Sequence, residues 1–275
     1  MREHKEQQNL SPASPIGTTA DAGELTHQGQ VESRADIHMH TSCSDGLPSP
    51  EALALHLAKT ELAVVAVTDH DSVEGAFRVA AALAGGPGPE VVIGEEVSSA
   101  DGHILALYIE RRIPPGLSAA ATIDAIHDQG GLAVAAHPLS FPSTAGRKFF
   151  LGVGTLAWTL PFDGVELVNG TPLAEVGNHK ARARHQQAGR VSAAVGGSDA
   201  HVAAAVGHVH TVFRGTTAAQ LRTAIEARET RPGVDHREHL LNTPAHVSWL
   251  VSRAALSFGV PAVQSMRLQW QRIRA

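Results

Sequence analysis

The stretch Ala35-Asp36-Ile37-His38-Met39-His40 determines how the rest of the chain is interpreted. We interpret it as a strand, and residues two apart on a strand point to the same side. His38 and His40 would therefore face one way, and Asp45 follows them on the next loop. Two imidazoles at a strand end with a carboxylate close behind them are typical of the beginning of a metal site.

Further residues of the ligand types follow or begin other strand-like segments. They are His70 after 62–68, Glu95 or Glu96 in 91–98, His103 at the start of 103–109, His137 after 132–136, and Asp199 and His201 after 191–196. Nine ligands are too many for one ion and suit two or three. Mixed imidazole and carboxylate ligands are suited to Mn, Zn or Fe. Without metal, so many polar groups would be poorly paired in a buried cluster.

Several acidic residues lie beside these candidate ligands, and not all of them are expected to bind metal. Glu95 and Glu96 are adjacent and would face opposite sides of a strand, so only one can enter the site. A carboxylate can bridge two cations, which an imidazole cannot do. Asp69 could orient a ligand from behind. Asp71 is interpreted as the N-cap of the following helix, with Glu74 at the reciprocal position of a capping box.

Strand-like and helix-like segments alternate from residue 34 onward, which favours an α/β fold with a mostly parallel sheet. The expected helices cover 49–60, 71–84, 117–129, 173–188 and 217–228, and 141–160 is expected to be loop and helix. Successive candidate ligands are separated by about one or two βα units. Ligands from five or six successive strands can meet in a closed barrel, whereas an open sheet has its site at one crevice.

The composition limits the class of protein. The chain has 275 residues, 43% of them apolar, and a net charge of −5. This charge argues against binding to duplex nucleic acid, although bound cations would still allow a small phosphorylated substrate. Cys43 is the single cysteine, so an internal disulfide is excluded. We expect no membrane span, no secretory signal and a cytoplasmic location. The oligomeric state is not predicted.

Three regions are expected along the chain. Residues 1–33 are polar and without periodicity, and we expect a disordered tail. Residues 34–230 would form the barrel, and 231–275 a loop and a helical C-terminal extension. An acid-free segment from Ser252 to Ala275 contains four arginines, Arg253, Arg267, Arg272 and Arg274.

The combined motifs resemble those of the PHP (polymerase and histidinol phosphatase) superfamily. They are His38-x-His40 with Ser44-Asp45-Gly46, Thr68-Asp-His70, Gly94-x-Glu96, His103, His137-Pro138 and Ser198-Asp199-x-His201. The resemblance implies a distorted (βα)7 barrel with a trinuclear metal centre. By this resemblance, His38, His40, Glu96 and Asp199 hold one metal. Glu96 bridges to a second, which His103 and His137 complete, and Asp45, His70 and His201 hold the third.

The Ser-Asp-Gly form of the first motif is similar to that of the stand-alone phosphoesterases, which act on nucleotides or short nucleic-acid ends. The implied reaction is hydrolysis of a phosphoester by a hydroxide that bridges the metals, since metal binding lowers the pKa of water from about 15.7 to about 7. Three alternatives stay open. They are a 5′–3′ exonuclease on short RNA or DNA, a histidinol-phosphate-type phosphatase, in which a His often replaces Asp45, and a catalytically silent metal-binding scaffold.

Catalytic and substrate-contacting residues are less well defined by the sequence. Asp69, His201 or a metal-bound water are candidates for the leaving-group acid. Candidates for substrate contacts are Arg147, Lys148, Asn169 and Arg184. His208 and His210 could also reach the mouth of the barrel, but we favour surface positions for them.

Overall fold

The computed structural model describes residues 31–140, 152–171, 174–235, 248–249 and 251. All of them belong to one compact unit, Val31–Ala275. The predicted tail lies outside these residues except for its last three positions, and the predicted C-terminal extension lies largely outside them.

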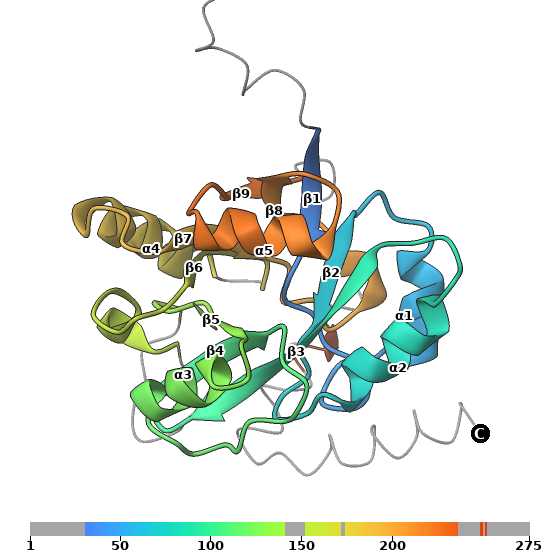
Figure 1. The fold of residues 1–275 in the computed structure, drawn as a ribbon, viewed down its shortest axis with the longest axis horizontal. Coiled ribbons are helices and arrows are strands. Elements are labelled where there is room, and N and C mark those ends of the chain that lie inside the picture. The colour runs from blue at the N-terminus through green and yellow to red at the C-terminus, as the bar shows by residue number, and fades with distance from the viewer. Residues whose placement is uncertain (1–30, 141–151, 172–173, 236–247, 250, 252–275) are drawn as a thin grey trace, which may run out of the picture. The chain divides into compact units, whose positions relative to one another are not determined.

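Nine strands form one sheet in the described part of the chain (Figure 1). They are β1 (Glu32–Asp36), β2 (Val64–Val67), β3 (Glu90–Ser99), β4 (Gly102–Leu107), β5 (Leu132–Ala135), β6 (Gly164–Asn169), β7 (Ala193–Gly197), β8 (Val209–Arg214) and β9 (Arg231–Val234). Their order in the sheet is β7-β6-β5-β4-β3-β2-β1-β8-β9. Four neighbouring pairs are parallel, and four, which involve β4, β8 or β9, are antiparallel. The α/β class is confirmed, but the sheet is less parallel than the βα alternation predicts.

The sheet closes on itself where the segment after β1 meets the segment after β7. Met39 and Ala200 form a parallel bridge, and the amide of His40 donates to the carbonyl of Ala200 at 2.9 Å. Below this bridge, the buried carboxylate of Asp36 accepts the amide of Ser198 at 3.0 Å. The result is the nearly closed, irregular barrel that the spacing of the candidate ligands predicts.

Within the described residues, five α-helices cover the sheet: α1 (Pro50–Leu57), α2 (Glu74–Leu83), α3 (Ala119–His127), α4 (Glu175–Gln187) and α5 (Ala218–Glu226). Oγ of Ser49 accepts the amide of Ala52 and caps α1. A capping box between Thr217 and Gln220 begins α5. The predicted cap of α2 is wrong. Its N-cap is Val73, and Asp71 instead accepts the amide of Ser98 on β3.

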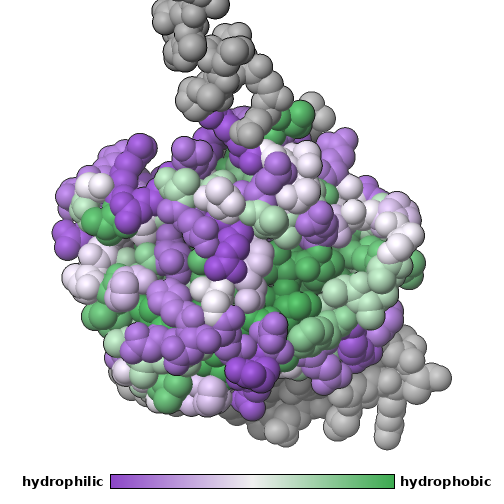
Figure 2. All heavy atoms as spheres, viewed as in Figure 1, coloured by the Kyte–Doolittle hydropathy of each residue, from purple (hydrophilic) through white to green (hydrophobic). Residues whose placement is uncertain are grey.

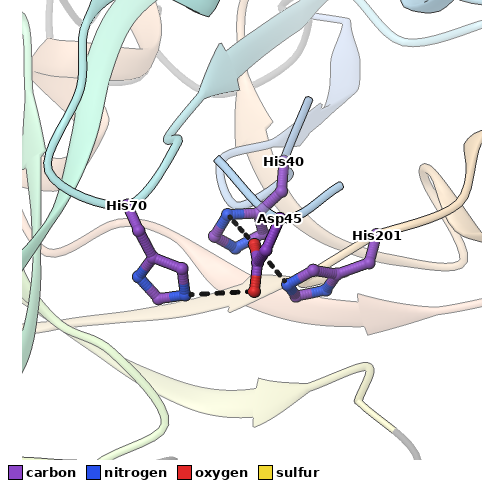
Figure 3. Close-up of side chains that lie close together, drawn as sticks. All are labelled: His40, Asp45, His70 and His201. Carbon is purple, nitrogen blue, oxygen red and sulfur yellow. Dashed lines mark ion pairs between the residues drawn. The ribbon is translucent and has the colours of Figure 1, made fainter. Parts of the chain in front are cut away.

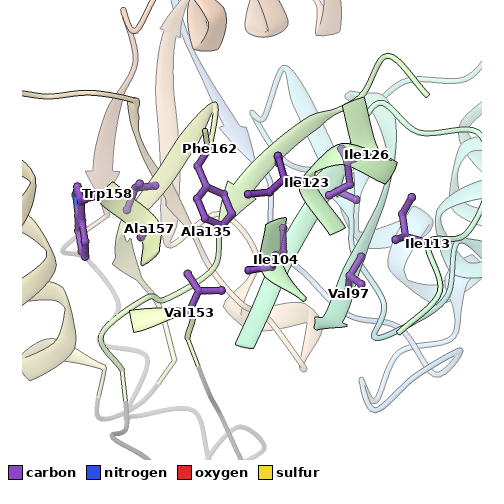
Figure 4. Packing of buried hydrophobic residues seen from close by; sticks show 14 of the residues in the cluster. Val97, Ile104, Ile113, Ile123, Ile126, Ala135, Val153, Ala157, Trp158 and Phe162 are labelled. Atoms are coloured by element: carbon purple, nitrogen blue, oxygen red, sulfur yellow. The ribbon is translucent and has the colours of Figure 1, made fainter. Parts of the chain in front are cut away.

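Aliphatic residues fill the space between the sheet and the helices. Figure 4 shows one cluster in which Ile104 of β4 and Ile123 and Ile126 of α3 pack with Phe162. A second cluster places Leu53 and Leu57 of α1 against β2. These clusters fix the strand ends relative to one another, and the candidate ligands stand at those ends.

Two boundaries differ from the sequence prediction. β1 begins at Glu32, inside the region expected to be the tail, and β9 extends the sheet to Val234, beyond the predicted end of the barrel at 230. In 141–160, the described part contains one short 3₁₀ helix, η1 (Gly154–Trp158). No helix among the described residues is long and apolar enough to cross a membrane.

Candidate metal centre

The structure brings all nine predicted ligands together at one end of the barrel. Three groups of side chains each place their ligand atoms within 4.8 Å of one another. The first is His38, His40, Glu96 and Asp199, the second is His70, Glu96 and His103, and the third is His40, Asp45, His70 and His201. His137 completes the nine, with Nε2 3.0 Å from Glu96. Residues up to 163 positions apart thus share one pocket.

Glu96 lies at the centre of this cluster. Its Oε1 is 2.9 Å from Nδ1 of His103 and 3.0 Å from Nε2 of His137. Its Oε2 is 3.2 Å from Nε2 of His38, 3.3 Å from Nε2 of His40 and 3.3 Å from Nδ1 of His70. The two oxygens of one carboxylate therefore face two different sets of imidazoles. Glu95 points the other way and accepts the amide of Ile113 at 2.7 Å, as the alternation of a strand predicts.

Asp199 closes the first group from the opposite side. Its Oδ1 lies 3.4 Å from Nε2 of His38 and 3.1 Å from Nε2 of His40. Its Oδ2 accepts the hydroxyl of Thr171 at 2.6 Å and the amide of Asn169 at 3.2 Å. One oxygen is thereby held in place while the other faces the imidazoles.

Asp45 joins three imidazoles in the third group (Figure 3). Its carboxylate lies 3.2 Å from Nε2 of His201, 3.7 Å from Nδ1 of His40 and 3.8 Å from Nε2 of His70. The side chains of Asp45, His70 and His103 are 12%, 23% and 18% exposed, whereas His38 and His40 are fully buried. The cluster is therefore open to solvent on the side of His70 and His103.

His201 is fixed as a ligand by its own backbone environment. Its Nδ1 lies 2.9 Å from the carbonyl oxygen of Asp199, which can only accept, so Nδ1 carries the proton. Nε2 then presents a lone pair toward Asp45. The indole of Trp249 stacks on the same ring at a centroid distance of 3.8 Å, and its Nε1 donates to the carbonyl of Asp45 at 3.0 Å. This geometry supports a ligand role for His201 rather than that of a leaving-group acid.

Glu166 is a member of the site that the sequence analysis missed. It is buried on β6, with Oε1 3.1 Å from Nδ1 of His38. Its Oε2 accepts the amide of His137 at 2.7 Å and the side-chain amide of Asn169 at 2.9 Å. The available signal was the one charged residue inside the otherwise uncharged run 164–168. A glutamate in a fully buried strand needs polar partners, and here those partners are the candidate ligands.

Asn169 and Asp69 both contact other residues of the site. The side-chain amide of Asn169 is buried and donates to Glu166 and Asp199, so it is not available to a substrate. Asp69 is buried too and accepts the amide and hydroxyl of Thr41, both at 2.7 Å, and the hydroxyl of Ser44 at 2.6 Å. It holds the loop that carries Asp45. These contacts do not support Asp69 as an acid for the leaving group.

The other predicted residues lie outside the cluster or outside the described residues. Arg147 and Lys148 lie outside the described residues, so their substrate contacts stay predictions. Arg184 is an exposed residue of α4. His210 is buried on β8, where Nδ1 lies 3.0 Å from the carbonyl of Gly207, so the favoured surface position is wrong.

The charges of the cluster are strongly coupled. Burial alone would raise the pKa of Glu96, but the imidazoles of His70, His103 and His38 hold it well below its ordinary value. Burial lowers the pKa of His70 to about 3. Burial also acts to lower the pKa of His40, yet its hydrogen bonds to Asp199 and Glu96 raise it to about 10. The carboxylates are therefore ionised, and the pocket favours positive charge.

Two of the candidate ligands are held in a backbone conformation that favours glycine. His137 has φ of 27° and Asp199 has φ of 52°. Such conformations cost non-glycine residues free energy and occur most often where a site requires a particular side-chain position. Both residues follow directly on buried strands, so the turn aims each side chain into the cluster.

Comparisons with known proteins agree with this arrangement. A family model described as PHP-associated matches residues 178–230. The chain is 35% identical over 147 residues to an uncharacterized protein of Methanocaldococcus jannaschii, which covers 50% of this chain and 81% of that protein.

Two solved structures share the fold. One is a two-domain protein from Bacteroides vulgatus that contains a predicted PHP-like metal-dependent phosphoesterase. It has a TM-score of 0.62 and 17% identity, over 75% of this chain and 66% of that one. The other is PsfC of Pseudomonas syringae, with a TM-score of 0.56 and 20% identity, over 83% of this chain and 99% of that one.

A nearly closed α/β barrel with nine imidazole and carboxylate side chains at one mouth defines the class of protein. The chain belongs to the PHP superfamily. The resemblance seen in the sequence motifs is thereby confirmed.

Proposed function

We propose that this protein is a hydrolase that cleaves phosphate esters with the help of two or three divalent cations bound at the candidate metal centre. The position of Glu96 carries the proposal. Its two oxygens lie between separate sets of imidazoles, at 2.9–3.0 Å from one set and 3.2–3.3 Å from the other. This is the arrangement needed for a carboxylate that bridges two cations.

The residues fit such cations. Within the described part of the chain, four buried ring nitrogens that face the carboxylates of the cluster form no hydrogen bond with good geometry: His38 Nε2, His40 Nδ1, His103 Nδ1 and His201 Nε2. Buried polar atoms without partners are rare and costly. A cation beside carboxylate oxygens would satisfy such lone pairs. Imidazole and carboxylate donors suit Mn, Zn or Fe, and three groups of ligand atoms suit a trinuclear centre.

The residues of each group would hold one cation, and His137 would add a ligand beside Glu96. Bound cations would lower the pKa of a water and offset the charge that develops on a phosphoryl group. The chain's own contribution is to fix the ligands. Glu166 orients the ring of His38, and Thr171 with Asn169 orients the carboxylate of Asp199. The exposed edge between His70 and His103 leaves one side of the cluster accessible to a substrate.

We propose a nucleotide or a short nucleic-acid end as the substrate. The support is the Ser44-Asp45-Gly46 motif, in which Asp45 stands among His40, His70 and His201. In this position the aspartate supplies an ionised ligand, since His201 and His40 hold its pKa below the ordinary value against the effect of burial. A small phosphorylated molecule is consistent with the narrow accessible edge and with the net charge of −5.

The test is to replace Glu96 by Gln and to measure metal content and hydrolysis together. Protein purified without chelator is analysed for bound Mn, Zn and Fe, then assayed on mononucleotides, 3′,5′-bisphosphates and short oligonucleotides with added Mn²⁺. We expect E96Q to lose at least one metal equivalent and at least about 100-fold in kcat/KM.

Glu95→Gln is the matched control, because this neighbouring carboxylate points away from the cluster. It should keep both metal content and activity. Full activity of E96Q would defeat the bridging role. An unmodified protein that binds metal but hydrolyses none of the phosphoesters would defeat the proposed reaction.

A further inference from the structure

A second concave site lies at the end of the barrel opposite the metal centre, where β1 begins. It is a cavity of about 610 Å³ whose lining includes Glu32, the first residue of β1. His38 and His40, in contrast, follow the last residue of the same strand, Asp36. The volume lies within the range of small-molecule sites, about 300–1,000 Å³. The cavity is therefore separate from the metal centre and large enough for a small ligand.

Positive charge is concentrated around this cavity. Five arginines line it, namely Arg182, Arg190, Arg214, Arg228 and Arg231. The acidic residues in the lining are Glu32 and Glu229. The whole chain has a net charge of −5, so the local charge is opposite to that of the molecule. Figure 2 shows hydrophilic residues over the part of the surface where α4 and α5 lie. Such a local excess attracts anions.

Two of these arginines form no ion pair with another described residue. Arg231 pairs with Glu32 at 2.8 Å, and Arg182 lies 3.2 Å from Glu175. Arg190 and Arg228 have no ion pair within the described part of the chain. A guanidinium carries a planar set of donors that matches the oxygens of a phosphate. Arg190 and Arg228 are thus available to an anion in the cavity.

The backbone at Arg190 and Arg228 adopts a left-handed conformation that favours glycine. Arg190 has φ of 58° and Arg228 has φ of 60°, and each follows closely on the end of a helix, α4 or α5. Glycine is the preferred residue in this left-handed conformation at a helix end. An arginine there favourably faces the carbonyl end of the helix. The two helix ends nevertheless direct both side chains to the same cavity.

Buried polar atoms in the lining lack partners as well. Nδ1 of His185 and Oγ of Ser192 have no hydrogen-bond partner among the described residues, and both side chains are only 3% exposed. Burial and the nearby Arg190 lower the pKa of His185, so its ring is neutral at pH 7. These two groups offer hydrogen bonds next to the arginines.

We propose that this cavity is a second binding site, for a small anion that carries two or more phosphate groups. Arg190 and Arg228 would bind the phosphate oxygens, and Arg231, Arg182 and Arg214 would add to the field. Each of the two guanidiniums, Arg190 and Arg228, could then bind a separate phosphate group, which is why the proposal specifies a ligand with more than one.

The test is calorimetric titration of the full-length protein with inorganic pyrophosphate at low ionic strength. The variant is the double substitution Arg190→Gly and Arg228→Gly. Because glycine suits the left-handed backbone at both positions, the variant should melt at an unchanged or higher temperature. We expect its affinity for pyrophosphate at the cavity to fall about 100-fold, about tenfold for each arginine that no longer binds a phosphate oxygen.

Arg111→Ala is the control, since it removes an exposed arginine that does not line the cavity. It should bind pyrophosphate as the unmodified protein does. The double substitution leaves the metal centre unchanged, so a class of sites whose affinity is not reduced in it belongs to that centre. Unchanged affinity and stoichiometry in the double variant would overturn the proposal. Binding of citrate as tight as that of pyrophosphate would overturn its preference for phosphate.

Discussion

The carboxylate of Glu166 lies 3.1 Å from Nδ1 of His38, while Nε2 of the same ring faces Glu96 and Asp199. A carboxylate that accepts the proton of one ring nitrogen leaves the other nitrogen with its lone pair toward the cluster. Glu166 therefore selects the form of His38 that can bind a cation. The same carboxylate accepts the amide of His137, so it positions two candidate ligands at once.

Glu166→Gln should weaken metal binding while the fold persists. A neutral amide of the same size no longer orients the proton on His38, and substitutions of this kind typically lower metal affinity about 10–100-fold. Competition titration with a coloured chelator measures the affinity directly, without an enzyme assay. Glu175→Gln, on the exposed face of α4, is the control. Unchanged metal affinity in E166Q would show that Glu166 only supports the fold.

Gly75→Ala should displace the loop that carries Asp45. A Cβ at Gly75 would overlap Oδ2 of Asp69 and come within 2.6 Å of Oγ1 of Thr41. Alanine favours a helix over glycine by about 1 kcal/mol, but overpacking a buried site costs about 1–3 kcal/mol. Because Asp69 is fixed by three hydrogen bonds, we expect the steric effect to exceed the helical gain.

The measurements for Gly75→Ala are thermal unfolding and metal stoichiometry. We expect a lower melting temperature and the loss of the metal held by the group around Asp45. Gly86→Ala is the matched control, because the nearest atom to its added Cβ would be 3.7 Å away. A variant with full stoichiometry and unchanged melting would contradict the assignment of Asp69 as the anchor of the loop.

Trp249 should report metal binding through its fluorescence. Its indole stacks on His201 at 3.8 Å and is one of three tryptophans in the chain. Paramagnetic Mn²⁺ bound by His201 would lie close enough to quench it. We expect quenching in the unmodified protein and a much smaller effect in Trp249→Phe. In Trp158→Phe, which removes an indole from the hydrophobic core, the quenching should persist. Equal quenching in all three proteins would exclude a metal beside His201.

Removal of metal should lower the melting temperature. A ligand at 100 times its Kd stabilises the folded state by about 2.7 kcal/mol, which corresponds to about 5–10 °C for a domain of this size. Differential scanning calorimetry before and after chelation, and again after Mn²⁺ or Zn²⁺ is restored, measures the shift. Glu96→Gln should show a smaller shift than the unmodified protein. Identical melting of the metal-loaded and metal-free proteins would argue against cations that link the strands.

The sequence predicted the members of the metal centre better than their surroundings. His38 and His40 were visible as candidates because an HxH pair at a strand end is unusual. Strand alternation admitted only one of Glu95 and Glu96, and the family resemblance indicated Glu96. The contacts of Asp69 and Asn169 were less predictable, since the sequence does not show which polar groups face them. Thr41, which donates to Asp69, is distant from it in the chain. Glu166, which accepts from Asn169, lies within an apolar segment.

Sheet topology was predictable only in part. The alternation of strands and helices indicates the α/β class, but it does not reveal that β4 pairs antiparallel with both β3 and β5. The turn between β3 and β4 contains only Ala100 and Asp101, too short for a crossover, and this was the available signal. β9 was missed because a four-residue strand that contains proline and glycine has no strand-like pattern.

The bridge between Met39 and Ala200 also has a consequence for how the protein matures. Asp199 reaches His38 and His40 only when the segment after β7 has been laid beside the segment after β1. During synthesis, most of the barrel must leave the ribosome before the group of His38, His40, Glu96 and Asp199 is complete. Metal binding by this group should thus come late, and a nascent chain that stops short of Ala200 would be unable to retain a cation at that position.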